Sequence, residues 1–311
     1  MKTAKAFAPA AISSFFEIHN IEDNKPITEL EKVGARGGGF GLKKGVHTKV
    51  NIQNAEKNNI QVFINSKPAP QAKTTQTVVE MLLAQSHGKF DVKVWHEIDV
   101  PIGTGFGTSA GGALTAGLTV KKALELPLTY NQIGKIAHVA EIKCRTGLGT
   151  VSSLTFAGGC ILVVEPGAPG ICQIDRIPLT EEEYMIVAGF FPSNIINKSI
   201  FSDAEKQKTI NRCGKKTLET VLAKPTLQNF LDSCWQFSED AGFATPKVRQ
   251  LVKLAKDAGA VGAAQNMLGE AVHALVNQKI AKRVEEAFKG VLPSENVLVS
   301  RIDFQGARLI E

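Results

Sequence analysis

Apolar and polar residues alternate between positions 92 and 100. The apolar residues are Val92, Val94, Ile98 and Val100, and the residues between them include Lys93, Trp95, Glu97 and Asp99. A period of two with one polar face is typical of a half-exposed antiparallel strand, because successive side chains of a strand point to opposite sides. We therefore predict a strand here with one face against the core.

Helical spacing replaces this alternation on both sides of the strand. Residues 74–87 form a short helix candidate, and residues 109–126 form a second that is rich in small side chains and ends before Pro127. Thr129-x-x-Gln132 has the pattern of a capping box, which predicts that a third helix starts there.

The first 65 residues indicate strands. An apolar stretch follows Lys5, but Pro9 interrupts it, so we interpret it as a buried first strand that runs into a ligand loop rather than as a signal peptide. The glycine cluster at 34–41 predicts a hairpin turn between edge strands. Arg36 within it suggests an anion-binding side chain instead.

The chain changes character near residues 180–183, where charges cluster before a new apolar run. Three helix candidates follow at 199–222, 226–240 and 246–258, and then come a strand, a helix at 279–289 and a closing strand at 296–304. Helices mixed with amphipathic strands predict an α+β architecture. We expect two domains, residues 1–180 and 181–311.

Residues 101–112, Pro-Ile-Gly-Thr-Gly-Phe-Gly-Thr-Ser-Ala-Gly-Gly, are the strongest candidate for chemistry. Glycines let the backbone approach a ligand closely, and the helix that follows offers free N–H groups at its N-terminus. The combination predicts a phosphate-binding loop. Thr108 and Ser109 supply hydroxyls that either bind phosphate or cap the helix.

Two other phosphate-binding motifs fit less well. Gly105-x-Gly-x-x-Ala110 also matches part of a dinucleotide fingerprint, with Glu125 at about the expected distance. However, the first strand of a dinucleotide-binding fold is buried on both faces, whereas the strand before this loop alternates. The chain also lacks the lysine-containing P-loop pattern.

Composition narrows the class of protein further. The net charge of +6 suits anionic small molecules, and no basic run interleaved with aromatic residues indicates a nucleic-acid partner. No apolar run approaches the ~18 residues that span a membrane. Five cysteines without a C-x-x-C pair predict a reducing, cytoplasmic location and argue against a zinc site.

Three motifs together resemble the GHMP kinases, named after galactokinase, homoserine kinase, mevalonate kinase and phosphomevalonate kinase. They are the loop at 101–110, the Ala-Pro strand at 8–17 and the small-residue stretch at 259–269. Within that superfamily the chain looks most like the archaeal pantoate kinases. The stretches that carry this closer resemblance are 10–17, 34–46, 146–149 with 158–159, 166–170 and 302–308.

The resemblance implies an N-terminal domain like domain 2 of ribosomal protein S5 and a ferredoxin-like C-terminal domain. It implies ATP with Mg²⁺, transfer of the γ-phosphoryl group to the 4-hydroxyl of pantoate in coenzyme A synthesis, and a homodimer. The residues expected to hold the phosphates are Pro101, Gly103, Gly105, Gly107, Thr108, Ser109, Ala110 and Gly111. Ser109 and Glu141 are the expected metal ligands.

Pantoate carries a carboxylate, which arginine binds well. The expected substrate residues are Ser13, Ser14, Glu17, Arg36 and Arg145, with Arg308 as a weaker candidate. Many members of the superfamily place an aspartate base where this chain has Thr150, and a threonine is no base at pH 7. Either the reaction uses no base or another residue, such as His138, replaces it.

Two alternatives stay open at this point. One is a GHMP kinase for homoserine, shikimate or mevalonate. The other is a non-catalytic nucleotide or metabolite sensor, suggested by the missing aspartate. The catalytic set expected for a kinase is Ser109, Glu141, Arg145 and Thr150.

Overall fold

A computed structural model describes residues 1–156, 158–191, 203–267 and 269–311. The strands are β1 (Lys2–His19), β2 (Ile21–Glu22), β3 (Lys25–Pro26), β4 (Gly34–Asn54), β5 (Asn59–Ile64), β6 (Lys67–Pro68), β7 (Phe90–Ile98), β8 (Cys160–Glu165), β9 (Gln173–Ile177), β10 (Tyr184–Phe190), β11 (Gly262–Asn266), β12 (Ala271–Asn277), β13 (Val297–Arg301) and β14 (Arg308–Ile310). The helices are α1 (Lys73–Leu83), α2 (Thr108–Leu124), α3 (Tyr130–Cys144), α4 (Thr150–Phe156), α5 (Ala204–Ala223), α6 (Leu227–Asp240), α7 (Pro246–Asp257) and α8 (Gln278–Lys289).

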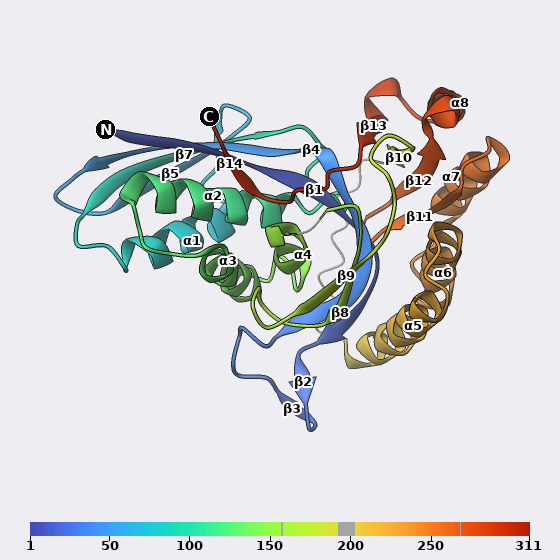
Figure 1. The fold of residues 1–311 in the computed structure, drawn as a ribbon, viewed down its shortest axis with the longest axis horizontal. Coiled ribbons are helices and arrows are strands. Elements are labelled where there is room, and N and C mark those ends of the chain that lie inside the picture. Colours follow the sequence, from blue (N-terminus) through green and yellow to red (C-terminus); the bar gives the residue numbers. More distant parts are fainter. Residues whose placement is uncertain (157, 192–202, 268) are drawn as a thin grey trace.

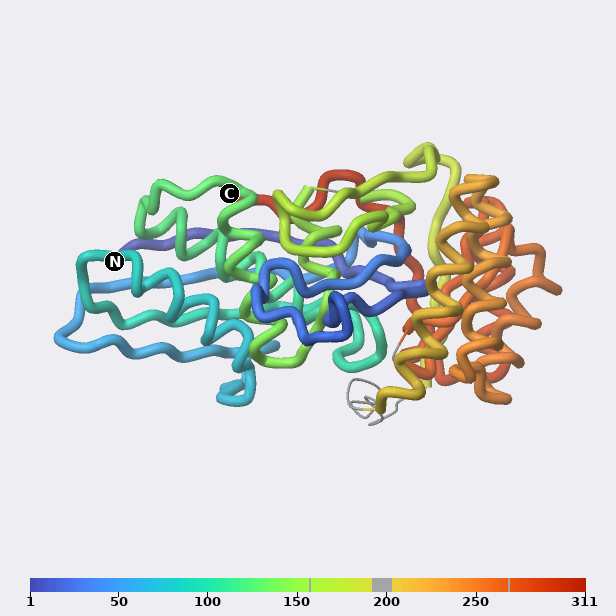
Figure 2. The backbone as a smooth tube through the Cα atoms, turned by 90° about the horizontal axis from the view of Figure 1, so that it is seen from below, coloured from blue at the N-terminus to red at the C-terminus, as the bar shows by residue number. Residues whose placement is uncertain are grey.

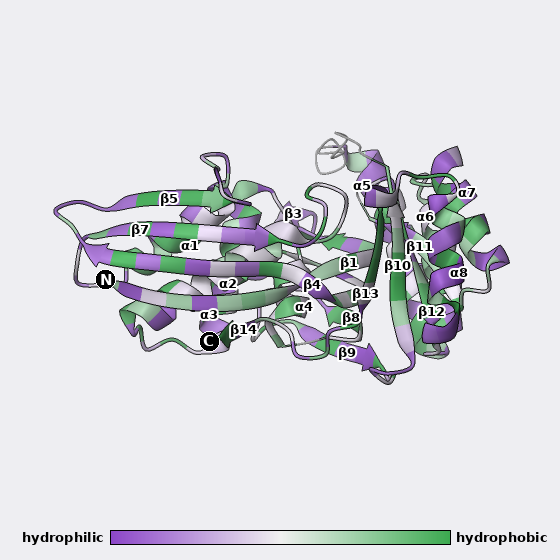
Figure 3. Cartoon of the chain, turned by 90° about the horizontal axis from the view of Figure 1, so that it is seen from above, coloured by the Kyte–Doolittle hydropathy of each residue, from purple (hydrophilic) through white to green (hydrophobic). Residues whose placement is uncertain are grey.

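An eight-stranded sheet forms the larger half of the molecule, in the order β14-β1-β4-β7-β5-β6, with β8 and β9 extending from β4. Helices α1 to α4 cover one face of it (Figure 1). The other face shows the alternating hydropathy of strands that have one side in solvent (Figure 3). In β7, Val92 and Val94 are buried as the alternation predicts, and His96 continues the same buried face.

The glycine cluster at 34–41 is part of the long strand β4, so the predicted hairpin turn is wrong. β4 pairs with β1 along nearly its whole length and with β8 on its other side. The pairing is unusually close at Gly39, where a Cβ atom would lie 1.7 Å from the carbonyl oxygen of Ile12. The glycines therefore permit close contact with a bulged β1 rather than a turn.

The smaller half has a four-stranded antiparallel sheet in the order β11-β12-β10-β13. Strands and helices follow one another as in a ferredoxin-like fold. Helices α5 to α7 connect β10 to β11, and α8 connects β12 to β13. These four helices lie together at one end of the elongated molecule (Figure 2). The α+β class and the ferredoxin-like C-terminal half are confirmed.

The two halves meet at β1 and at the chain's end. Phe15 and Phe16 of β1 pack edge-on against Phe237 of α6. Strand β14 returns to pair with β1, so the last residues join the first sheet. The change of sheet lies between β9 and β10, and we keep the division at 180/181 as a proposal.

Local signals placed most helices well and missed one. Thr129 and Gln132 form the predicted capping box at the start of α3. Helix α4 was not predicted, because its seven residues are too few to show a helical period. The predicted helix at 199–222 corresponds to α5, with positions 199–202 outside the described residues. No helix among the described residues is long and apolar enough to cross a membrane.

Candidate functional site

The loop between β7 and α2 has the geometry of an anion-binding turn. Gly103, Gly105 and Gly107 have φ angles of +83°, +85° and +61°, a region that favours glycine. Gly105 also lies so close to the C-terminal half that a Cβ atom would be 2.9 Å from the Met267 carbonyl oxygen. The loop is fixed to β1 by a hydrogen bond from the Ala11 N–H to the Phe106 carbonyl.

Gly107, and not Thr108 or Ser109, is the N-cap of α2. A glycine has no side chain to accept the N–H groups of the first turn, and the Gly111 N–H donates the bond that closes it, to the Gly107 carbonyl. The preceding N–H groups and the positive end of the helix dipole therefore stay available to an anion. The two hydroxyls are free for other contacts.

A cavity of about 360 Å³ opens at this helix N-terminus. Its walls come from β1, β4, β8, the loop before α2, the turn between α3 and α4, and Met267. The expected site residues that line it are Ser13, Arg36, Gly103, Gly105, Gly107, Thr108, Ser109, Arg145 and Thr150. The others, Ser14, Glu17, Pro101, Ala110, Gly111 and Glu141, lie outside the lining.

Glu141 lies immediately behind the cavity wall. It is 2% exposed, and its Oε1 accepts a hydrogen bond of 3.2 Å from the Thr146 hydroxyl. Burial raises the pKa of Glu141 to about 7, against the lowering effect of the neighbouring Ser109 and Thr146 hydroxyls. The chain reverses at Arg145 (φ +54°), which brings Gly147 so close that a Cβ atom there would lie 2.4 Å from Glu141 Oε2.

These oxygens fit a magnesium ion. One carboxylate and neighbouring hydroxyls beside a phosphate site are the hard oxygen donors that Mg²⁺ prefers. Clusters of three or more His, Cys, Asp and Glu side chains suited to a metal are absent from the described part of the chain.

Arg36 and Glu17 pair directly across β4 and β1. Arg36 Nη2 donates to Glu17 Oε1 at 2.6 Å, and the two residues are register partners in the sheet. Arg36 reaches the cavity while Glu17 stands behind it, which orients the guanidinium group. Arg145 reaches the same cavity from the turn after α3 and is exposed.

Ser14 is not in the cavity, contrary to the expected substrate role. The pairing of β1 with β4 shifts register between Ser13 and Phe15, so Ser14 is the extra residue of a bulge. Its hydroxyl is fully buried and lies 2.9 Å from His273 Nε2, and His273 Nδ1 lies 2.9 Å from Asn266 Oδ1. Ser14 thus joins β1 to the C-terminal sheet.

Thr150 begins α4 and lines the cavity beside Gly107. Arg36 and Arg145 are the ionisable side chains among the described lining residues, so the cavity wall supplies no carboxylate or imidazole as a base. His138 does not replace one, because its ring is buried and Nε2 lies 2.8 Å from the Val33 carbonyl oxygen. Arg308 is also away from the cavity, paired with buried Asp303 at 3.0 Å.

Two site residues were missed. Thr74 of α1 lies 3.5 Å from the Ser109 hydroxyl and 3.0 Å from the Thr146 hydroxyl. Thr146 belongs to the stretch 146–149, which carries part of the family resemblance, but no role was predicted for it. Nothing local marks Thr74, since a threonine in the first turn of a helix is common.

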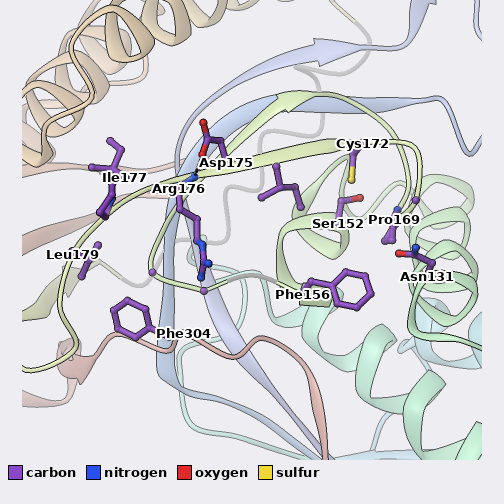
Figure 4. Close-up of a pocket in the computed structure, with 15 residues that line it drawn as sticks. Asn131, Ser152, Phe156, Pro169, Cys172, Asp175, Arg176, Ile177, Leu179 and Phe304 are labelled. Carbon is purple, nitrogen blue, oxygen red and sulfur yellow. Dashed lines mark hydrogen bonds between the residues drawn. The ribbon is translucent and has the colours of Figure 1, made fainter.

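A second cavity of about 840 Å³ lies beyond α4 along the edge strand β9 (Figure 4). Its lining includes Asn131, Phe156, Arg176 and Phe304. It shares no described lining residue with the first cavity. The phosphate loop and both site arginines therefore belong to the smaller cavity alone.

Comparison with known proteins agrees with this geometry. The family model for the GHMP kinases N terminal domain matches residues 73–158. The pantoate kinase of Thermococcus kodakarensis is 30% identical over 289 residues, which cover 91% of this chain and 90% of that protein. The pantoate kinase of Methanocaldococcus jannaschii is also 30% identical, covering 85% of this chain and 89% of that protein. A solved structure described as a phosphotransferase related to the CoA biosynthesis pathway has a TM-score of 0.84 at 28% identity, covering 99% of this chain and 98% of that one.

Proposed function

Since this chain belongs to the GHMP kinase family, alongside the archaeal pantoate kinases, we propose that it transfers the γ-phosphoryl group of ATP to the 4-hydroxyl of pantoate. The product is 4-phosphopantoate, a precursor in coenzyme A synthesis. The observation that carries the proposal is the cavity itself, which joins a phosphate-binding helix N-terminus to two arginines. An anionic nucleotide and an anionic acceptor both fit such a site.

The phosphate groups of ATP bind at the loop before α2. The left-handed glycines of this loop and the first residues of α2 line the cavity, and their backbone N–H groups are the proposed donors to the β- and γ-phosphates. This arrangement replaces the lysine of a P-loop. When bound, Mg²⁺ neutralises charge on the transferring phosphate, and Ser109 and Glu141 are its proposed ligands.

The acceptor binds through its carboxylate. Arg36 and Arg145 present guanidinium groups to the cavity, and Ser13 lies on the same wall. Glu17 holds Arg36 from behind by the 2.6 Å ion pair, which leaves the other N–H groups of Arg36 for the substrate. The two arginines thereby place the acceptor hydroxyl against the phosphate loop.

The proposed transfer uses no general base. The described lining offers serine and threonine hydroxyls, Thr150 among them, but no side chain that takes a proton at pH 7. Phosphoryl transfer passes through a loose transition state in which positioning and positive charge matter more than proton removal. The acceptor proton leaves to phosphate or solvent after transfer has begun.

A panel of acceptors tests the proposal. ADP release, coupled to NADH oxidation, is measured with pantoate, homoserine, shikimate and mevalonate at saturating Mg²⁺ and ATP. We expect turnover with pantoate and at least about a hundredfold lower kcat/KM for the others, because each loses or misplaces a carboxylate contact. Turnover of another acceptor but not pantoate would overturn the substrate assignment. ATP binding without any turnover would favour a sensor.

Replacing Arg36 by lysine is expected to raise the KM for pantoate by about 10- to 100-fold, the loss of one charged hydrogen-bonding pair. The KM for ATP is expected to stay within about twofold, because the proposed phosphate ligands are in the loop before α2 and do not include Arg36. Steady-state kinetics in both substrates checks this. Arg176→Lys, in the second cavity, is the matched control, and an equal effect of both variants would contradict the role of Arg36.

Two further properties belong to the proposal. We propose a homodimer, as the resemblance implies, which light scattering after size exclusion would test. We also propose a cytoplasmic location, in keeping with the five free cysteines.

A further inference from the structure

Four side chains from four different segments meet around Ser109. Ser109 and Thr74 are in the first turns of α2 and α1, Glu141 is near the end of α3, and Thr146 is in the turn that follows. The Ser109 hydroxyl donates to Thr74 at 3.5 Å, Thr74 and Thr146 hydroxyls are 3.0 Å apart, and Thr146 donates to Glu141 at 3.2 Å. We call these four residues the hydroxyl ring.

Counting protons gives the ring a direction. Each of its three hydroxyls has one proton to donate, and an ionised carboxylate only accepts. Thr146 gives its proton to Glu141, Thr74 can then give its proton to Thr146, and Ser109 gives its proton to Thr74. All three protons are used, and the series ends on the one group that needs donors.

Ser109 has a second option that would defeat its proposed role. Its hydroxyl also lies within hydrogen-bonding reach of Glu141, and one proton cannot serve both partners. If Ser109 donated to Glu141, a lone pair of that carboxylate would be occupied by a proton instead of facing the cavity. Thr74 offers the Ser109 proton a different acceptor.

We propose, on the basis of the function proposed above, that Thr74 is a positioning residue for the metal ligands. Its hydroxyl takes the Ser109 proton and, through Thr146, steadies the Glu141 carboxylate, so that oxygen lone pairs of Ser109 and Glu141 face the same point. Thr74 is 6% exposed and is therefore held in place by packing rather than by the ligand. Thr74 is not among the residues that line the cavity.

The position of Thr74 in its helix supports this assignment. Ala72 is the N-cap of α1 and makes no side-chain capping bond, and Thr74 directs its hydroxyl across to α2 and the α3–α4 turn rather than to its own helix. Its neighbour Thr75 instead bonds His96 Nε2 at 3.0 Å, which anchors α1 to the sheet. The anchoring of α1 therefore does not depend on Thr74 alone.

The test replaces the Thr74 hydroxyl by a methyl group of the same size, Thr74→Val. The readout is the binding of a non-hydrolysable ATP analogue by calorimetry, with Mg²⁺ and with EDTA. Affinity in EDTA is expected to change less than about threefold, while the gain in affinity on adding Mg²⁺ falls about 10- to 100-fold, as for other partners of metal ligands. Thr74→Ser is expected to restore the gain, because serine keeps the hydroxyl.

Thr77→Val is the matched control. Thr77 lies one turn further along α1 and is partly buried, but its hydroxyl contacts Cys144 Sγ at 3.5 Å. The control is expected to keep the full Mg²⁺ gain. Thr146→Val is expected to reproduce the Thr74→Val result, and it also serves if Thr74→Val does not fold.

Two outcomes separate this inference from the proposed function. A Thr74→Val protein with the same Mg²⁺ gain as the parent would overturn the role of Thr74 while the kinase assignment stands. A parent protein that binds no nucleotide in either buffer would overturn the kinase assignment and, with it, this inference.

Discussion

Replacing Glu141 by glutamine is expected to lower kcat for pantoate phosphorylation by about a hundredfold or more, the usual loss when one preorganised electrostatic group is removed. The substitution keeps the shape of the side chain and removes its negative charge. The carboxylate is buried directly behind Ser109 and accepts from Thr146, so its charge acts in a setting with little water. Single-turnover kinetics with saturating ATP measure the loss in the chemical step.

Stability distinguishes this loss from misfolding. Burial already disfavours the charged form of Glu141, so the neutral amide is expected to unfold no more easily than the parent at pH 8 in EDTA. Thermal unfolding checks this. Glu125→Gln, at the exposed C-terminal end of α2, should change neither kcat nor stability. An unchanged kcat in Glu141→Gln would remove this residue from the site.

Acid is expected to destabilise the fold through two buried histidines. Burial lowers the pKa of His96 to about 4 and that of His273 to about 3, so both rings stay neutral in the folded protein when unfolded histidine has already taken up a proton. Because the unfolded state binds more protons below pH 6.5, the free energy of unfolding falls as the pH falls. At pH 4.5 each of these two rings is expected to have lowered the free energy of unfolding by about 3 kcal/mol.

The surroundings of both rings explain why they stay neutral. His96 has hydroxyl partners, Thr48 on Nδ1 at 2.7 Å and Thr75 on Nε2 at 3.0 Å. His273 lies between the Ser14 hydroxyl and the Asn266 side-chain oxygen. These hydroxyl and amide partners are neutral, so they give no charge with which an imidazolium could pair.

Urea unfolding between pH 7 and pH 4.5 measures this effect. Carboxylates contribute to the same trend, so the informative quantity is the difference in slope between the parent and His96→Asn. Near pH 5, the slope of the free energy of unfolding against pH is expected to be smaller in His96→Asn than in the parent by about 1.4 kcal/mol per pH unit, the value for one proton. His87→Asn, at an exposed position, is expected to leave the slope unchanged. A parental slope in His96→Asn would contradict the buried neutral state of His96.

Predictions from sequence succeeded where the determining interactions are local. The capping box at Thr129 needs only residues three apart, and the alternation in β7 needs only its own side chains. The glycines at 34–41 were misinterpreted because their cause is non-local: the backbone of β1 approaches β4, and the approach at Gly39 requires a residue without a Cβ atom. A glycine cluster has the same sequence pattern whether it forms a turn or allows a close contact between two strands.

The same distinction applies to the site. The alternating glycines and the helix N-terminus lie within ten residues, so the phosphate loop and the family resemblance could be read from the chain alone. Ser14 was misplaced because one bulge in β1 turns its side chain away from the cavity. The role of Thr74 had no local signal, because its partners Ser109 and Thr146 lie 35 and 72 positions further along the chain.

The sequence by itself therefore determined the architecture class, the phosphate loop and the kind of enzyme, because short-range backbone preferences and motif spacing carry them. The tertiary structure decided which side chains share the cavity, which arginine is held by Glu17, and how the hydroxyl ring and the Ser14–His273–Asn266 contact are built. Those contacts join residues up to 259 positions apart. Packing of whole helices and sheets brings such residues within hydrogen-bonding distance, and no local pattern encodes that.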